Sequence, residues 1–444
     1  MATDTIAAVA TARGQGAIGV VKISGPLASR IADTVACKTL APRQAYYLAL
    51  QNRDGKPIDQ GIAIYFAGPD SYTGEDVLEL QAHGNGFVLD ELLDTAIAAG
   101  ARLAQPGEFT ERAFLNNKMD LAQAEAVADL IESNSREAAR AAVESLRGEF
   151  SKGVAAIRDQ LIDARVYIEA ALDFSEEEID FLADRELAER LINLNHSIER
   201  LLARATEGRL MRDGITVVIV GAPNVGKSSL LNALTGEDSA IVTDVPGTTR
   251  DLLREIIVID GMPVHIVDTA GLRETDDKVE REGIRRARKQ IDNADHILAV
   301  REAGQGTDQD LLQGLPDDVP VTWVFNKTDL LDGNSTEADD VPDTLYLSAK
   351  TGQGIDQLRM HLKQAAGFTS TPEGAFMARR RHIDALQAVQ QFGLSASSHI
   401  SGTGAGELAA EDLRMAQDQL NLITGAFSSD DLLGEIFGRF CIGK

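Results

Sequence analysis

The spacing of apolar residues divides the chain into stretches of different character. Near the N-terminus, the short apolar runs 20–24 and 77–81 predict strands. The stretch 87–100 has the apolar spacing of a helix, and we expect it to end at Gly100 because glycine favours helix ends. Residues 1–118 therefore predict a mixed α+β domain.

Residues 119–213 have the spacing of long helices. Apolar residues recur every three or four positions in two sets, which are Val154, Ile157, Leu161, Ala164 and Ile168, and Leu187, Leu191, Leu194, Ile198 and Leu201. This spacing places each set on one face of a helix. The same pattern returns over 371–444, where we expect a flexible turn at 401–407 and a last helix that runs to about Phe440.

Between these two helical stretches, residues 214–370 alternate short β-rich runs with helices, which is typical of an α/β domain. The simplest arrangement is one helical domain, made of 119–213 and 371–444, that is interrupted by an inserted domain. The predicted fold class is therefore multidomain, with a mixed α+β domain, an all-α domain and an α/β insertion.

Composition narrows the class of protein. The chain has 444 residues, enough for about three domains of ~150 residues each. Its formal net charge of -26 argues against tight nonspecific binding of nucleic acid. Two cysteines cannot build a disulfide framework, and the sequence contains no secretory signal and no membrane span. We therefore expect a cytoplasmic protein.

One glycine pattern is misleading. Residues 14–19 match G-x-G-x-x-G, but a dinucleotide site needs a strand before this motif and a helix after it. Here a strand follows instead, so we predict a glycine-rich turn.

A second glycine pattern has the right surroundings. The apolar strand 215–220 runs directly into 221–228, which reads G-x-x-x-x-G-K-S and opens a helix. Such a loop wraps its backbone N–H groups around phosphates at a helix N-terminus. Lys227 is expected to reach the β- and γ-phosphates, and Ser228 to hold Mg²⁺.

Three further motifs follow in order and indicate GTP. Asp268 begins D-T-A-G, Asn326 begins N-K-T-D and Ser348 begins S-A-K, each at the end of a strand. The carboxylate of Asp329 can accept hydrogen bonds from guanine N1–H and N2–H₂, a pair of donors that adenine lacks. The residues expected to contact GTP are Asn224, Val225, Gly226, Lys227, Ser228, Ser229, Thr243, Asp244, Val245, Pro246, Gly247, Thr248, Thr249, Asp268, Thr269, Ala270, Gly271, Asn326, Lys327, Asp329, Ser348, Ala349 and Lys350.

The catalytic part of this site is unusual. Many GTPases carry a glutamine after D-x-x-G to orient the attacking water, but Leu272 stands there in this chain. Either hydrolysis is slow or another group orients the water. Thr249 is expected to supply a second hydroxyl to Mg²⁺. Asn224 offers an uncharged oxygen beside the phosphates that suits a monovalent cation, which could supply the positive charge of an arginine finger.

The motifs GAPNVGKSS, IVTDVPGTTRD, DTAGLRETDDKVEREGI and the terminal CIGK resemble those of the MnmE (TrmE) family of tRNA modification GTPases. The N-terminal stretches SYTGEDVLELQAHGN and PGEFTERAFLNNKMDLAQAEAV are similar to the same family, so the resemblance covers essentially the whole chain. It implies a folate-binding N-terminal domain (1–118) that also dimerises, a helical domain in two parts (119–213 and 371–444), and an inserted Ras-like P-loop GTPase domain (214–370).

The resemblance also implies a reaction. A homodimer would form a heterotetramer with the flavoprotein MnmG and act on tRNA. Together they would add an aminomethyl or carboxymethylaminomethyl group to C5 of the wobble uridine, position 34. A tetrahydrofolate derivative, the 5-formyl or the 5,10-methylene form, would supply the one-carbon unit.

Site roles follow from the resemblance by position. K⁺ would be held by Asn224 and by the backbone carbonyls of Thr243, Val245 and Thr248, and Glu280 would orient the water. The folate contacts would be Lys22, Glu79, Lys118 and Lys444. Members of the family can have arginine in place of Lys22, and lysine keeps the charge but loses the two-pronged hydrogen bonding.

Cys441 leaves three interpretations open. It is an incidental thiol on a loose tail, a residue that shapes the folate pocket, or a catalytic thiolate that acts on the uridine or the one-carbon unit. The rival function is a ribosome-assembly or regulatory GTPase. Relatives of that kind, such as Era, carry a basic RNA-binding domain, and no such segment follows the GTPase motifs here.

Overall fold

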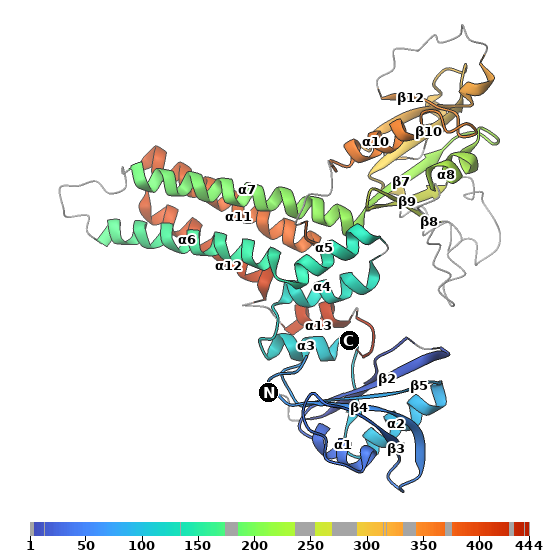
Figure 1. Cartoon of the computed structure of the whole chain (residues 1–444). Helices are drawn as coiled ribbons and strands as arrows, with labels where there is room; N and C mark the ends of the chain where they lie inside the picture. The colour runs from blue at the N-terminus through green and yellow to red at the C-terminus, as the bar shows by residue number, and fades with distance from the viewer. Residues whose placement is uncertain are drawn as a thin grey trace. The chain divides into compact units, whose positions relative to one another are not determined.

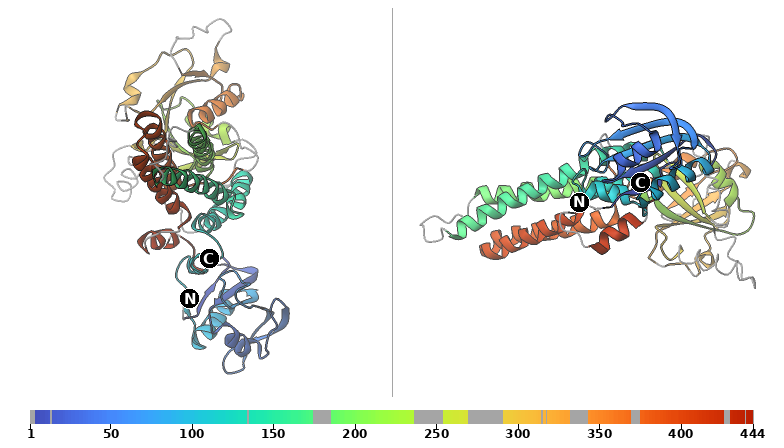
Figure 2. Two further views of the ribbon diagram at one scale, coloured as in Figure 1. Left: turned by 90° about the vertical axis from the view of Figure 1, so that its left-hand side faces the viewer. Right: turned by 90° about the horizontal axis from the view of Figure 1, so that it is seen from below.

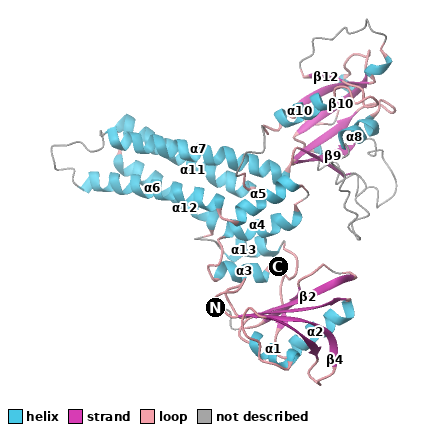
Figure 3. Ribbon diagram, viewed as in Figure 1, coloured by secondary structure: helices cyan, strands magenta, loops and turns pink. Residues whose placement is uncertain are grey.

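The computed structural model describes residues 4–12, 14–133, 135–173, 185–235, 254–268, 291–313, 315–316, 318–331, 343–368, 375–425, 430–438 and 440–443. They form two compact units, and each unit contains a sheet and helices (Figures 1 and 3). The first unit comprises Met1–Ala128, Leu146–Ile162 and Leu413–Lys444, and the second comprises Asp129–Ser145 and Asp163–Asp412. The domain bounds given above stay a prediction.

The first unit contains a sheet of six strands in the order β3-β4-β5-β2-β1-β6. The strands are β1 Ile6–Val9, β2 Gly16–Ser24, β3 Ala45–Gln51, β4 Pro57–Phe66, β5 Val77–Gly84 and β6 Arg102–Leu103. Neighbours are antiparallel except β1 and β6. Helices α1 (Ala28–Ala36) and α2 (Gly86–Ala98) cover one face over a core that includes Val21, Ile23 and Leu80 (Figure 2).

The two strands and the helix predicted in this unit are confirmed. The two predicted strands lie in β2 and β5, and α2 stops just before Gly100, whose φ of +111° suits glycine. The glycine-rich turn predicted at 14–19 is wrong for Gly16–Gly19, which already belong to β2. The rejection of a dinucleotide site holds, because β2 pairs antiparallel with β5 and the motif opens no helix.

The opposite face of this sheet meets α3 (Glu108–Leu115), through Ile6, Ala8, Ala104 and Phe109. Arg112 of α3 is buried, and its guanidinium donates to Asp4 Oδ1 at 2.9 Å, Glu108 Oε1 at 2.9 Å and Glu75 Oε2 at 3.2 Å. A buried arginine needs such partners, because an unpaired buried charge is strongly destabilising.

The remaining long helices follow the predicted spacing. They are α4 Leu121–Glu132, α5 Arg136–Leu146, α6 Glu149–Asp173, α7 Arg185–Asp213, α11 Arg380–Ser398, α12 Gly406–Thr424 and α13 Asp430–Gly438. Every residue of the two predicted apolar sets is buried, in α6 and α7 respectively. Among the helices that the structure describes, none combines the length and apolar composition that crossing a membrane requires.

The predicted turn at 401–407 is wrong in its first half. Residues His399–Thr403 form a π-helical turn that continues α11, and α12 already begins at Gly406. The change of direction is concentrated at Gly404, whose φ of +65° is accessible to glycine at little cost. The last helix ends at Gly438, close to the predicted Phe440.

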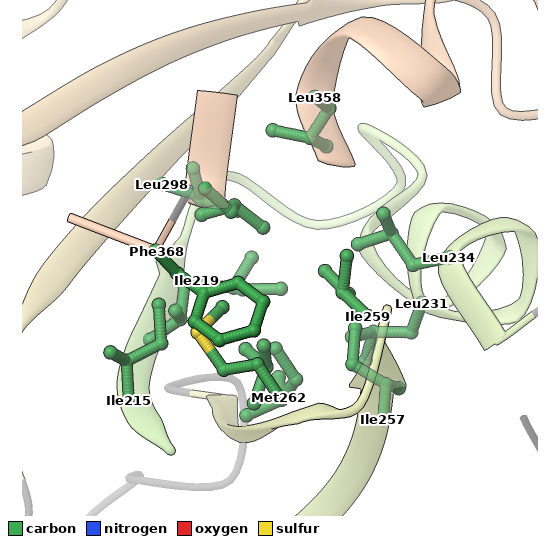
Figure 4. Packing of buried hydrophobic residues seen from close by; sticks show 14 of the residues in the cluster. Ile215, Ile219, Leu231, Leu234, Ile257, Ile259, Met262, Leu298, Leu358 and Phe368 are labelled. Atoms are coloured by element: carbon green, nitrogen blue, oxygen red, sulfur yellow. The ribbon is translucent and has the colours of Figure 1, made fainter. Parts of the chain in front are cut away.

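The second unit contains a sheet of six strands in the order β12-β11-β10-β7-β9-β8. The strands are β7 Ile215–Val220, β8 Arg254–Ile259, β9 Met262–Asp268, β10 His296–Glu302, β11 Val321–Asn326 and β12 Thr344–Tyr346, and the helices that belong to this sheet are α8 Lys227–Thr235 and α10 Ile355–Ala365. All neighbours are parallel except β8 and β9. Figure 4 shows the apolar core on one face, where Ile219, Leu298 and Leu358 pack together.

A chain of hydrogen bonds joins two histidines beside Trp323 in this unit. His296 Nε2 lies 2.8 Å from Thr322 Oγ1, which lies 2.6 Å from His361 Nε2. His296 is 4% exposed, and its Nδ1 has no hydrogen-bond partner among the described residues. Burial lowers the pKa of His296 to about 4.

This histidine makes stability depend on pH. Between pH 6.5 and 4 the unfolded chain binds a proton on His296 that the folded chain excludes, so stability falls as pH falls. The shift from 6.5 to about 4 corresponds to a loss of about 3 kcal/mol. Denaturant unfolding followed by the fluorescence of Trp323, the single tryptophan, measures this loss. His296→Gln should flatten the dependence, whereas the exposed His196→Gln should keep it; equal pH slopes in all three proteins would contradict the assignment.

Candidate nucleotide-binding site

The phosphate-binding loop lies between β7 and α8. Strand β7 is central and almost fully buried, so it fixes the start of the loop, and α8 begins at Lys227 with its free N–H groups at the loop. Asn224 has φ +65° and Gly226 has φ +98°. A side chain at Gly226 would collide with Asn326 Nδ2, so this position requires glycine.

The Lys227 side chain lies inside this loop. It is 8% exposed, and its Nζ donates to the carbonyls of Gly221 at 2.8 Å and Ala222 at 3.1 Å. The ammonium is thus held where phosphate oxygens are expected. The next residues, Ser228 and Ser229, are exposed beside it.

Asn326 connects the phosphate-binding loop to the two guanine motifs. It is 2% exposed at the end of β11, and its Nδ2 donates to Val225 O at 2.9 Å. Its Oδ1 accepts from the backbone N–H of Lys327 at 2.8 Å and of Ala349 at 3.0 Å. One buried amide therefore links the phosphate-binding loop at Val225, about a hundred residues earlier in the sequence, to the two guanine motifs at Lys327 and Ala349.

Asp329 and Ser348 face each other across the guanine motifs. The Ser348 hydroxyl donates to Asp329 Oδ1 at 2.6 Å, and this hydrogen bond lowers the pKa of Asp329 below its usual value. The carboxylate is therefore charged at neutral pH. Lys327 has φ +66°, and its ammonium pairs with Glu302 at 3.1 Å.

The strand register brings Asp268 to the edge of the sheet where β7 leads into the phosphate-binding loop. Asp268 ends β9 and pairs with Ile219 of β7, one residue before the end of that strand. Carboxyl ends of parallel strands flanking a central strand form the usual ligand crevice of such sheets. Predicted residues Thr243, Asp244, Val245, Pro246, Gly247, Thr248, Thr249, Thr269, Ala270, Gly271 and Glu280 lie outside the described residues, as does Lys444.

The predicted folate residues lie in the first unit. Lys22 of β2 is directly opposite Glu79 of β5, so both side chains leave the same face of the sheet, the face that α3 meets. The Lys22 ammonium lies 4.7 Å from the centre of the Tyr72 ring and 5.5 Å from that of Phe109. Lys118 is exposed and donates to Pro69 O at 3.0 Å.

The C-terminal tail is docked in the same unit. Ile442 forms a bridge with Pro106, and Gly107 N donates to Cys441 O at 3.4 Å. Gly443 has φ +95°, and a Cβ there would lie 2.6 Å from Val9 O at the end of β1. Phe440 is buried, whereas Cys441 is exposed. The tail around Cys441 is therefore held in place with its thiol accessible.

Comparisons with known proteins cover the whole chain. Residues 5–118 match the family model described as GTP-binding protein TrmE N-terminus, and residues 121–441 match the MnmE helical domain. The tRNA modification GTPase MnmE of Ectopseudomonas mendocina (strain ymp) is 54% identical over 453 residues, which is 100% of this chain and 99% of that protein. The protein of the same name from Vibrio cholerae is 52% identical over 454 residues, 100% of both.

The chain belongs to the MnmE family of tRNA modification GTPases.

Membership in the MnmE family decides between the two functions weighed above, because it makes the chain a GTPase of tRNA modification rather than of ribosome assembly. The three parts predicted from sequence are those of the family: a TrmE N-terminal α/β domain, a helical domain and a Ras-like GTPase domain. A crystal structure of an Aquifex aeolicus Era variant bound to GDP and AlF4⁻ is similar over 40% of this chain and 66% of that chain, with 24% identity and a TM-score of 0.26.

Three residues that shape these sites received no role in the sequence analysis. The rings of Tyr72 and Phe109 contact the Lys22 ammonium, and Gly443 packs against Val9 at the end of the tail. Burial raises the pKa of Tyr72, against a smaller opposite effect of the hydrogen bond with Thr110. All three residues stand in motifs quoted above for the family resemblance: Tyr72 in SYTGEDVLELQAHGN, Phe109 in PGEFTERAFLNNKMDLAQAEAV and Gly443 in CIGK. The motifs therefore pointed to these residues, but they did not show what the side chains contact.

The Asp329 carboxylate should determine base specificity. Asp329→Asn should weaken GTP binding about 10²-fold or more, because hydrogen bonds to a charged carboxylate are stronger than those to a neutral amide, and the amide nitrogen cannot accept one. Xanthosine triphosphate carries a carbonyl where guanine has its amino group, so the asparagine amide can donate to it and the variant should gain affinity for it. Competition binding with both nucleotides measures the exchange. The exposed Asp356→Asn serves as control, and unchanged GTP affinity in Asp329→Asn would refute the role.

Proposed function

We propose that this member of the MnmE family couples potassium-dependent GTP hydrolysis to the addition of an aminomethyl or carboxymethylaminomethyl group at C5 of the wobble uridine, position 34, of certain tRNAs. It acts with the flavoprotein MnmG and takes the one-carbon unit from a tetrahydrofolate derivative. The observation that carries this proposal is the docked tail. A thiol held by Gly443 and Phe440 in the same unit as Lys22 fits a modification site better than an incidental cysteine does.

The nucleotide site fits Mg²⁺. This ion prefers oxygen ligands, and Ser228 presents an exposed hydroxyl at the start of α8, next to the strand end at Asp268. We assign Ser228 and Thr249 as its ligands. When bound, the ion neutralises charge on the phosphates, and Lys227 adds its ammonium from within the loop.

The exposed Asn224 supports a second cation. Asn224 has a left-handed backbone and an exposed side chain within the phosphate-binding loop, so its amide oxygen is available to a cation beside the phosphates. We assign K⁺ to Asn224 and the carbonyls of Thr243, Val245 and Thr248. Glu280 then orients the attacking water, because Leu272 cannot.

The proposed folate site is the face of the N-terminal sheet that carries Lys22 and Glu79, and Lys118 and Lys444 complete it. The lysines offer positive charge to the carboxylates of the folate glutamate, and Glu79 can accept hydrogen bonds from the pterin ring. We further propose that the chain is a cytoplasmic homodimer that binds MnmG as a heterotetramer and accepts tRNA as substrate.

GTP hydrolysis should be faster in K⁺ than in Na⁺ at equal concentration and fixed Mg²⁺, by about 10-fold or more, because a fitted cation stabilises charge that develops in the transition state. Asn224→Gly should lose this difference. Glycine is the matched substitution because it removes the amide and still adopts φ +65°. Equal rates in the two salts for the natural chain would rule the potassium site out.

Cys441→Ser should abolish or sharply reduce wobble-uridine modification and leave GTP hydrolysis near normal, because the thiol lies in the unit that does not contain the nucleotide site. Nucleoside analysis of tRNA after reaction, together with phosphate release, measures the two activities. Cys37→Ser, at the other exposed cysteine, is the control and should change neither. Normal modification by Cys441→Ser would make Cys441 incidental.

A further inference from the structure

The GTPase part is attached to the helices by two crossings of the chain. Helix α7 ends at Asp213 and β7 begins at Ile215, whereas the return crossing reaches α11 at Arg380. Arg212 and Arg379 therefore stand at the helical side of the outgoing and the returning crossing. Any rearrangement of the sheet relative to these helices has to pass through these two points.

One carboxylate holds both crossings. Asp129, near the end of α4, is 5% exposed, and its Oδ1 accepts from Arg212 Nε and from Arg379 Nη2, each at 2.8 Å. We call these three residues the Asp129 clamp. Removing one partner of a buried ion pair is strongly destabilising because it leaves an uncompensated charge, so the three residues of the clamp depend on one another.

Three further hydrogen bonds lie near the clamp, two of them from α5 and the residue before it. Ser145 of α5 accepts from Met377 N at 2.7 Å on the returning crossing. At the other crossing, His265 of β9 hydrogen-bonds through Nε2 with Asp213 O at 3.0 Å. Ser135 donates weakly to Gly261 O, at 3.5 Å, in the turn before β9.

Strand β9 connects this joint to the nucleotide. It starts at Met262, next to the turn that α5 contacts, and it ends at Asp268 on the phosphate edge of the sheet. A single short strand thus has the clamp region at one end and the nucleotide site at the other. A shift of β9 that accompanies GTP hydrolysis would therefore move the start of the strand, next to the clamp.

A cavity of about 330 Å³ lies beside the clamp. Asp129, Glu132, Arg212, His265 and Met377 are among its lining residues. Close-packed interiors resist movement, whereas a cavity leaves room for side chains to change partners. The joint thus combines strong ion pairs with space for an alternative arrangement.

We propose that Asp129 is a positioning residue that couples GTP hydrolysis to tRNA modification by holding both crossings in register with β9. The inference rests on the proposed function. Asp129 would contact neither nucleotide nor tRNA. It would act through Arg212 and Arg379. Without the clamp, the chain should still hydrolyse GTP, but changes in the position of β9 should no longer be transmitted to the helices through Arg212 and Arg379.

The test compares Asp129→Asn with Glu132→Gln, which makes the same chemical change one turn along α4 at an exposed side chain that lines the same cavity. Each variant is assayed as the full chain with its partner and tRNA for kcat and KM of GTP hydrolysis and for modification per GTP hydrolysed. Asp129→Asn should keep both GTP parameters within about 3-fold and lower modification per GTP about 10-fold, within the range of couplings between sites. Glu132→Gln should match the natural chain.

Arg379→Gln gives a second reading if Asp129→Asn does not fold, which unfolding followed by Trp323 fluorescence will show. It removes one arm of the clamp and should uncouple the activities in the same way. Unchanged modification per GTP in a folded clamp variant would overturn the inference, as would a parallel loss of both activities. If the natural chain itself does not modify tRNA, the proposed function fails, and this inference fails with it.

Discussion

The buried amide of Asn326 is the interaction on which the nucleotide site depends. It bonds Val225 in the phosphate-binding loop and the backbone of both guanine motifs, and it fills the space that only glycine leaves at position 226. Because β7 and β11 are parallel strands on either side of β10, their ends meet at one edge, and Asn326 joins them there. The phosphate-binding loop and the two guanine motifs are therefore held together by one buried side chain.

Strand β9 links two ends of the same sheet. Strand β9 delivers Asp268 to the phosphate edge and begins at the turn that contacts α5. The acidic residue Asp129 holds the two arginines that border the inserted part. The tail with Cys441 is held by different contacts, with Val9, Pro106 and Gly107, in the other unit. The Asp129 clamp lies in the same unit as the nucleotide site, and within that unit it holds the helices next to the start of β9.

Much of the fold follows from sequence because the burial pattern has a regular period. The two apolar sets in α6 and α7 are buried at every position, and the strand before the phosphate-binding loop is β7. The π-helical turn at His399–Thr403 was missed, because Ser401 and Gly402 read as turn residues while helix α11 continued through them. Long-range contacts such as Asp129 with Arg379 leave no periodic signal, since they join residues 250 positions apart. The motifs named the nucleotide-site residues, but the contacts of Lys22 with Tyr72 and Phe109 required coordinates.

Modification of the wobble uridine by this GTPase can be measured directly in cells. The most direct measurement is nucleoside analysis, by chromatography and mass spectrometry, of total tRNA from cells that lack the protein. The account predicts that uridines carrying an aminomethyl-type group at C5 disappear, and that they return when the natural chain is expressed but not when Lys227→Ala is expressed. An unchanged nucleoside profile in the cells without the protein would contradict it.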